Sequence, residues 1–153
     1  MRILENRIPP PIVTVIVGLA MWATSLIARP WEIPATARFI LIAAFFLVAG
    51  VFAAPAFIAF RRAETTIDPV RIDRASALVT TGIYRLTRNP MYVGLTALLC
   101  SWAVYLAVPW AFLGPVFFIL FMTRFQIIPE ERTMETKFGR AYADYKRRVR
   151  RWL

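Results

Sequence analysis

NPMYVGLTALLCSWAVYLAVPWAFLGPVFFILFMT, residues 89–123, is the stretch that decides the fold. It runs for 35 positions without a charged residue, and Val108-Pro109-Trp110 interrupts it. At about 1.5 Å per residue, a helical stretch of this length spans roughly 52 Å, slightly less than two crossings of a hydrocarbon core about 30 Å thick. We therefore expect a compact hairpin of two transmembrane helices, at residues 90–107 and 110–128.

Two further apolar blocks precede this hairpin, at residues 12–28 and 36–60, with a turn that contains Pro30 and Pro34 between them. Hydrophobic residues make up 59% of the 153-residue chain, against about 45–50% in ordinary soluble domains. We therefore expect an all-α integral membrane protein, with about four transmembrane helices in a single domain that covers residues 1–153.

Basic residues are concentrated in two segments. Of the 19 Lys and Arg in the chain, six lie in the loop at residues 61–89 and eight in the tail at residues 129–153, and they outnumber the 9 Asp and Glu. Cytoplasmic segments of membrane proteins are enriched in Lys and Arg. We therefore expect a multi-pass protein of a bacterial cytoplasmic membrane with both termini cytoplasmic. This interpretation explains the positive charge through the membrane, and no nucleic-acid partner is expected.

The tail at residues 129–153 has the pattern of an amphipathic cytoplasmic helix. Its apolar residues recur at spacings of three and four, and Gly139 predicts a break in it. The apolar set is Met134, Phe138, Ala141, Tyr145, Val149 and Trp152. Lys and Arg crowd the last ten residues, as is typical of a segment lying on anionic lipid. We interpret these ten residues as a membrane anchor without specific contacts.

The residue types that are missing exclude several kinds of site. The chain has no histidine, and its one cysteine, Cys100, lies in an apolar run, where we expect it to be a packed side chain. A disulfide within one chain is therefore impossible, and no metal site is expected. No charged residue falls in the middle of a predicted helix, which argues against an ion channel or a proton-coupled transporter. The sequence specifies no oligomeric state.

Two polar clusters flank the hairpin. Residues 88–92 lie at the start of its first helix and Glu130-Glu131 follow its second, so the topology brings them to the same depth, roughly 10 Å apart. Asn89 is a good N-cap and Pro90 a good first helical residue, and Arg88 adds positive charge to this helix end. The glutamates can accept hydrogen bonds from an ammonium group or from ribose hydroxyls. S-adenosylmethionine suits such a site, although a capped helix with flanking ion pairs explains the same residues.

An ordered set of motifs extends over residues 77–153. It consists of Leu78-Val79, Gly82-Ile83-Tyr84-Arg85, Arg88-Asn89-Pro90, Tyr92 and Gly94, then Pro129-Glu130-Glu131 and Met134, then Phe138-Gly139, Tyr142 and Tyr145, and finally Val149, Arg151 and Trp152. This set resembles the isoprenylcysteine carboxyl methyltransferase family and the related phospholipid methyltransferases. The resemblance implies a pocket for S-adenosylmethionine between the last two helices and the C-terminal helix. The product of the cofactor would be S-adenosylhomocysteine. The implied cofactor-binding residues are Tyr84, Arg88, Asn89, Tyr92, Gly94, Glu130, Glu131, Tyr142 and Tyr145.

The resemblance implies methyl transfer to a lipophilic acceptor at the cytoplasmic face, of the isoprenylcysteine carboxyl O-methyltransferase type. The candidate catalytic residues are Arg88, which would clamp a carboxylate, and Glu131 and Tyr92. A carboxylate acceptor needs no base. The alternative, a phosphatidylethanolamine-type N-methyltransferase, must remove a proton from the amine, and Glu131 or Tyr92 would take it. Many relatives have His where this chain has Asn89, which cannot act as a base. A non-enzymatic four-helix transporter subunit or scaffold is a further alternative.

Overall fold

All regular secondary structure in the described part of the chain is helical. The computed structural model describes residues 5, 7–62 and 78–153, so most of the predicted loop at residues 61–89 lies outside the described residues. The α-helices are α1 (Pro10–Ser25), α2 (Ala35–Arg62), α3 (Pro90–Leu106), α4 (Leu113–Met122) and α5 (Ile128–Arg148). Two 3₁₀ turns, η3 (Gly82–Arg85) and η4 (Pro109–Phe112), and one π-helical turn, η5 (Thr123–Ile127), complete the set.

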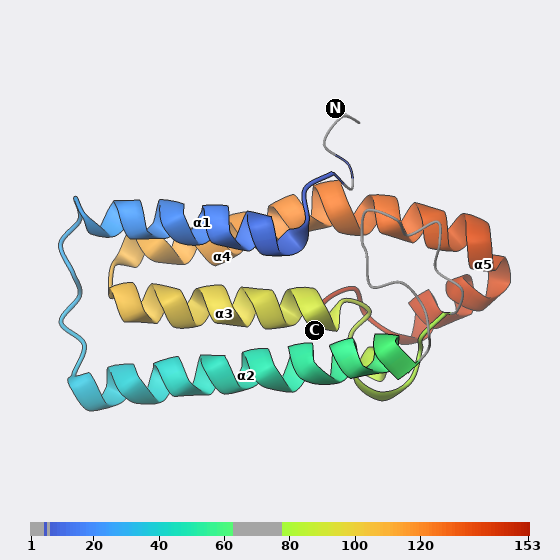
Figure 1. Ribbon diagram of the computed structural model, residues 1–153, viewed down its shortest axis with the longest axis horizontal. Coiled ribbons are helices and arrows are strands. Elements are labelled where there is room, and N and C mark those ends of the chain that lie inside the picture. Colours follow the sequence, from blue (N-terminus) through green and yellow to red (C-terminus); the bar gives the residue numbers. More distant parts are fainter. Residues whose placement is uncertain (1–4, 6, 63–77) are drawn as a thin grey trace.

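The first four helices lie side by side along the long axis of the molecule (Figure 1). Helix α3 lies between α1 and α2, and α1 and α3 both contact α4. The end of α2, the start of α3 and the end of α4 meet at one end of the bundle, where α5 also lies (Figure 1). The polar segments that flank these helices therefore gather at this end.

Two helical stretches of the described chain are long and apolar enough to cross a membrane, namely Ala35–Ala59 and Pro109–Arg148. The second has 40 residues, about 60 Å of helix, and therefore exceeds a hydrocarbon core of about 30 Å. Apart from Arg124, all charged residues of this stretch follow Pro129, so we place the end of the spanning part near Ile128. Helices α1 and α3 are apolar but shorter, with 16 and 17 residues, and their crossing of the membrane stays a prediction.

Apolar side chains fill the interior and also cover much of the outside of the bundle. Between α1, α3 and α4 the buried core includes Val17, Met21, Leu99, Phe118 and Met122. The outer faces of α1, α2 and α4 expose large apolar side chains, including Ile16, Leu19, Phe39, Phe46, Leu47, Phe117 and Leu120. A soluble monomer rarely exposes so much apolar surface, whereas a protein surrounded by lipid does.

A glycine allows α2 and α3 to approach closely. A Cβ atom added at Gly94 would lie 3.0 Å from the carbonyl oxygen of Ala49 and 3.0 Å from Cβ of Ala53. Ser101, two turns further along α3, donates a hydrogen bond to the carbonyl of Ile42 at 3.1 Å. Gly94 therefore faces α2, and its small size lets the two backbones pack together.

The predicted division at residues 128 and 129 is not a break in the structure. Helical residues continue from Leu113 past Pro129 to Phe138, and the π-helical turn η5 ends at Ile127, two residues before Pro129. Proline has no N–H to donate to the preceding turn, and a π-helical turn is a common local adjustment within an α-helix. Further along, the predicted break at Gly139 is confirmed, because this residue has φ 48° and ψ −120° inside α5.

The end of the chain folds back onto the bundle. Helix α5 ends at Arg148, and Val149 has extended geometry (φ −126°, ψ 133°). The last residues return beside the start of α3 (Figure 1), where the Arg88 amide donates to the carbonyl of Arg150 at 2.9 Å. Trp152 Nε1 donates to Thr123 Oγ1 at 3.1 Å. These contacts contradict the interpretation of the last ten residues as a membrane anchor without specific contacts.

Candidate functional site

The start of α3 and the start of α5 form one polar site, although about forty residues separate them in the chain. The Tyr92 hydroxyl donates to Glu130 Oε1 at 2.6 Å, and Arg88 Nη1 lies 3.0 Å from Glu131 Oε1. The predicted meeting of residues 88–92 with Glu130 and Glu131 is therefore confirmed. It arises because α3 leaves one end of the bundle and the α4–η5–α5 run returns to it.

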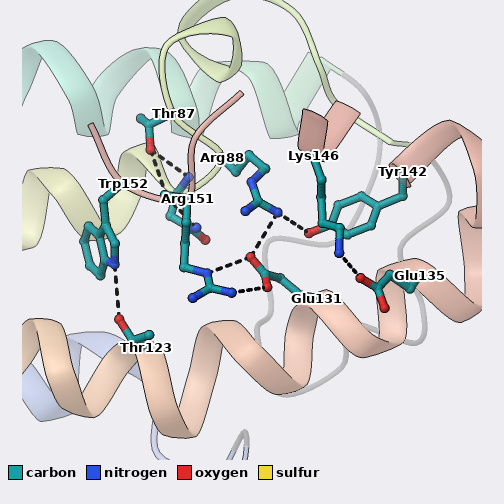
Figure 2. Close-up of polar contacts among 10 residues, drawn as sticks. Thr87, Arg88, Thr123, Glu131, Glu135, Tyr142, Lys146, Arg151 and Trp152 are labelled. Carbon is teal, nitrogen blue, oxygen red and sulfur yellow. Dashed lines mark hydrogen bonds and ion pairs between the residues drawn. The ribbon is translucent and has the colours of Figure 1, made fainter. Parts of the chain in front are cut away.

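Glu131 is the centre of an arginine–glutamate cluster, which we define as Arg88, Glu131, Tyr142 and Arg151 (Figure 2). Arg151 binds the carboxylate through two bonds, Nε to Oε1 at 2.9 Å and Nη2 to Oε2 at 2.7 Å. Arg88 Nη1 binds Oε1 from the other side and also lies 3.4 Å from the Tyr142 hydroxyl. Both oxygens of Glu131 are thus engaged by arginines.

Arg88 carries a polar group that the described residues leave unsatisfied. Its side chain is only 10% exposed and that of Glu131 only 11%, so their charges are held largely out of water. Arg88 Nε is buried and has no hydrogen-bond partner among the described residues. A buried N–H without a partner costs about 1–3 kcal/mol, and a bound acceptor would recover that cost. The cluster also has two arginines for one carboxylate, so an anionic group is the favoured occupant.

Tyr142 supplies a neutral hydroxyl to this cluster. Burial, aided by the charge of Glu131, raises the pKa of Tyr142 to about 12, against the lowering effect of Arg88. The hydroxyl therefore stays protonated at neutral pH. It can both accept from Arg88 and donate to a ligand oxygen.

Glu130 lies in a second group, the glutamate–tyrosine group, which we define as Glu130, Tyr92 and Gln126. Gln126 Nε2 donates to Glu130 Oε1 at 2.7 Å, beside the bond from Tyr92. Burial raises the pKa of Glu130 to about 7, while the two hydrogen bonds act in the opposite direction. This carboxyl can therefore exist in either protonation state near neutral pH.

The structure corrects the role predicted for Asn89. The residue precedes α3, but its side chain makes no capping bond to the helix. Asn89 Nδ2 instead donates to the carbonyl of Arg151 at 2.9 Å, and Thr87 Oγ1 donates to the same carbonyl at 3.1 Å. The returning C-terminal segment supplies an acceptor that the sequence pattern did not place there. Pro90, by contrast, occupies the first turn of α3 as predicted.

Three further residues predicted to bind the cofactor, Tyr84, Tyr145 and Gly94, lie near these two groups but do not all contact one another. Tyr145 donates its hydroxyl to the carbonyl of Tyr84 at 2.7 Å, and both are buried with Tyr142 against α2. Burial is the main cause that raises the pKa values of Tyr84 and Tyr145 above the ordinary tyrosine value, so both stay neutral. Gly94 packs against α2. Cofactor contacts by these residues stay a prediction.

Sequence reasoning missed two residues of the site. Gln126 lies four residues before Glu130, a spacing that puts both on one helix face, and it is an isolated amide in an apolar run. That signal could have identified it. Arg151 belonged to the motif set but was interpreted as part of a basic anchor. Its pairing with Glu131 depends on the return of the chain after the break at Gly139. Gly139 predicted this break but not the direction in which the chain continues.

The described residues contain no group of three or more His, Cys, Asp or Glu side chains able to hold a metal ion. Together, the fold and the site define a helical membrane protein with one buried polar site at the end of an apolar bundle. Residues 37–141 match the family model described as phospholipid methyltransferase, and the chain belongs to this family. Membership indicates a membrane methyltransferase that acts on lipid.

Sequence similarity extends to a shorter protein as well. An uncharacterized protein of Haemophilus influenzae is 46% identical over 63 residues, which are 41% of this chain and 100% of that protein. No solved structure matches the chain.

Proposed function

We propose that this protein transfers a methyl group from S-adenosylmethionine to the head group of a membrane lipid at the cytoplasmic face. One observation carries the proposal: groups of both charge signs converge at one end of an otherwise apolar bundle, where Arg88 Nε is buried and has no partner among the residues that the structure describes. The family match supports the reaction class.

The donor set fits an amino-acid–nucleoside ligand. Arg88 Nε and the Tyr142 hydroxyl would bind its carboxylate, and Glu130 offers an acceptor for positive charge. Both oxygens of Glu131 are already bound, so its first role is to hold Arg88 in place. The cofactor, when bound, would supply a methyl group on a positively charged sulfur. The remaining predicted cofactor residues are Tyr84, Asn89, Tyr92, Gly94 and Tyr145, which lie on the surrounding elements.

The protein's own contribution is position and the exclusion of water. Methyl transfer is an in-line displacement, so its rate depends on holding donor and acceptor in one geometry. Tyr84 and Tyr145 are buried together with Tyr142, a member of the arginine–glutamate cluster. Such burial keeps water away from the reacting groups.

The first candidate acceptor is the amine of a phospholipid head group. The family description supports it, and so does Glu130, whose carboxyl can take up a proton near neutral pH. The second candidate is a carboxylate of the isoprenylcysteine type. The excess of arginine over carboxylate in the cluster favours it, because this excess attracts an anionic acceptor.

Binding calorimetry on the purified protein in detergent tests the cofactor assignment. Arg88→Lys keeps the charge but removes the Nε donor and the planar fork, so we expect S-adenosylmethionine to bind at least about tenfold more weakly. Arg140→Lys, on an exposed part of α5, is the matched control and should bind as the unmodified protein does. Equal affinity of both variants, or no binding by the unmodified protein, would overturn the assignment.

A further inference from the structure

The two neighbouring glutamates of α5 have opposite surroundings. Glu131 is held by two arginines that engage both of its oxygens. Glu130 accepts hydrogen bonds from two neutral donors, the Tyr92 hydroxyl and the Gln126 amide, and both bind the same oxygen, Oε1. A carboxylate between two arginines is a poor proton acceptor, whereas one among neutral donors is a good one.

The position of Glu130 also suits contact with a lipid head group. Glu130 lies in the first turn of α5, two residues after Ile128, near which we place the end of the spanning part of the helix. Tyr92, from the first turn of α3, contacts it across the helix interface at 2.6 Å and restricts the carboxylate to one orientation. Gln126, one turn earlier on the same helical run, fixes it from a second direction.

We infer that Glu130, and not Glu131, takes the proton from an ammonium-bearing acceptor, while Tyr92 and Gln126 position its carboxylate. This inference rests on the proposed function. The two adjacent glutamates would then have different roles. Glu131 maintains the arginine–glutamate cluster, and Glu130 prepares the nucleophile.

An N–H bond of the lipid ammonium breaks, its electron pair stays on nitrogen, and the proton moves to Glu130 Oε2. The freed nitrogen pair then forms a bond to the methyl carbon while the carbon–sulfur pair returns to sulfur, which becomes neutral. The nitrogen regains a positive charge in the methylated product. Glu130 passes its proton to water at the cytoplasmic face before the next cycle.

The groups that face Glu130 set the pH at which it works. Tyr92 from α3 and Gln126 from η5 stabilise its ionised form by hydrogen bonds, and Glu131 on its own helix and burial favour the protonated form. Tyr84 from η3 is near enough to interact with its charge. Removing the Tyr92 or Gln126 donor should therefore move the titration of Glu130 to higher pH.

The test measures the rate of lipid methylation by the protein reconstituted in vesicles that contain phosphatidylethanolamine, with S-adenosylmethionine added. Glu130→Gln keeps the shape, and at a saturating concentration of S-adenosylmethionine it should lose about 100-fold or more in methylation rate, as expected for a lost general base. The unmodified protein should show a rate that rises with pH through a midpoint near neutrality. Tyr92→Phe should raise that midpoint, which a purely structural role would not do.

Infrared difference spectroscopy gives a readout independent of turnover. The band of a protonated carboxyl should disappear as pH rises through neutrality, and it should be missing in Glu130→Gln. If the unmodified protein methylates lipid but Glu130→Gln retains its rate and pH profile, the inference fails and the proposed function stands. If the unmodified protein neither binds S-adenosylmethionine nor methylates any lipid, the proposed function fails first.

Discussion

Glu131 forms ion pairs with both arginines of the arginine–glutamate cluster, Arg88 and Arg151. Arg88 is 10% exposed, so loss of its carboxylate partner would leave a buried and uncompensated charge. Breaking a buried pair by removing one partner costs about 3–5 kcal/mol. We expect Glu131→Ala to lower the free energy of unfolding by this amount, measured by chemical denaturation in detergent.

Arg151 provides the matched control for that measurement. Its side chain is 37% exposed, and Glu131 keeps Arg88 as a partner when Arg151 is removed. Exposed pairs contribute about 0–1 kcal/mol. Arg151→Ala should therefore cost much less than Glu131→Ala. Equal losses would show that Arg88 does not depend on Glu131.

The pKa of Glu130 predicts how stability depends on pH. Burial raises this pKa from 4.5 to about 7, so the folded protein binds the proton more tightly than the unfolded chain does. This contribution to stability is fully present below about pH 4.5 and is lost as pH rises to about 7. The loss should be on the order of 3 kcal/mol.

Glu130→Gln should remove this part of the pH dependence, which can be measured by unfolding at several pH values between 4.5 and 7. Glu135→Gln, on the exposed side of α5, should leave it as it is in the unmodified protein. A Glu130→Gln variant whose stability still falls over this range would place the titrating group elsewhere.

Single residues of the site differ in how far the sequence could predict them. The meeting of Arg88 and Tyr92 with Glu130 and Glu131 follows from the topology, because polar residues at the two ends of an apolar hairpin lie at the same depth. The side-chain role of Asn89 could not be predicted, since its partner is a carbonyl 62 residues away on the returning segment. Local capping rules take no account of an acceptor delivered by tertiary folding.

At the scale of the helices, Gly94 sets the distance between α2 and α3. A methyl group there would meet backbone and Cβ atoms at 3.0 Å. We expect Gly94→Ala to lower stability by about 1–3 kcal/mol, the usual cost of overpacking. Thermal unfolding in detergent, followed by circular dichroism, measures the loss.

Gly50→Ala is the matched control for Gly94→Ala, because a Cβ atom at Gly50 meets nothing within 4 Å. Alanine is the better helix former, so this variant should be neutral or more stable by up to about 1 kcal/mol. If Gly94→Ala is as stable as Gly50→Ala, the close packing of α2 and α3 does not require a glycine at position 94.

Helix positions were largely predictable and helix connections were not. The apolar blocks gave the approximate limits of α1 to α4 because each must bury or shield its backbone polar groups. The sequence rules place a boundary at Pro129, yet the π-helical turn η5 lets the helix continue past it. That turn also carries Gln126, so the irregular element belongs to the site.

At the scale of the whole molecule, the bend at Gly139 within α5 and the extended segment after Arg148 together close the site, and the bend brings Lys146 against Glu135 (Figure 1). The returning segment supplies the Arg150 and Arg151 carbonyls to residues 87–89 and the Arg151 side chain to Glu131. A basic amphipathic pattern favours a helix on the membrane surface. Gly139 predicted the break in this helix, but nothing in the pattern indicated that the segment after the break returns to the start of α3. The overall helical class and the position of the break could therefore be predicted, whereas the closure of the site could not.

The central claim is that the polar site built on Arg88 and Glu131 transfers methyl groups to membrane lipid. The most direct measurement supplies S-adenosylmethionine with a labelled methyl group to the reconstituted protein in vesicles of host lipid, followed by lipid extraction. We expect label in the lipid fraction with the unmodified protein and a loss of about tenfold or more with Arg88→Lys. A folded, unmodified protein that labels no lipid, or an Arg88→Lys variant that labels it equally well, would contradict the claim.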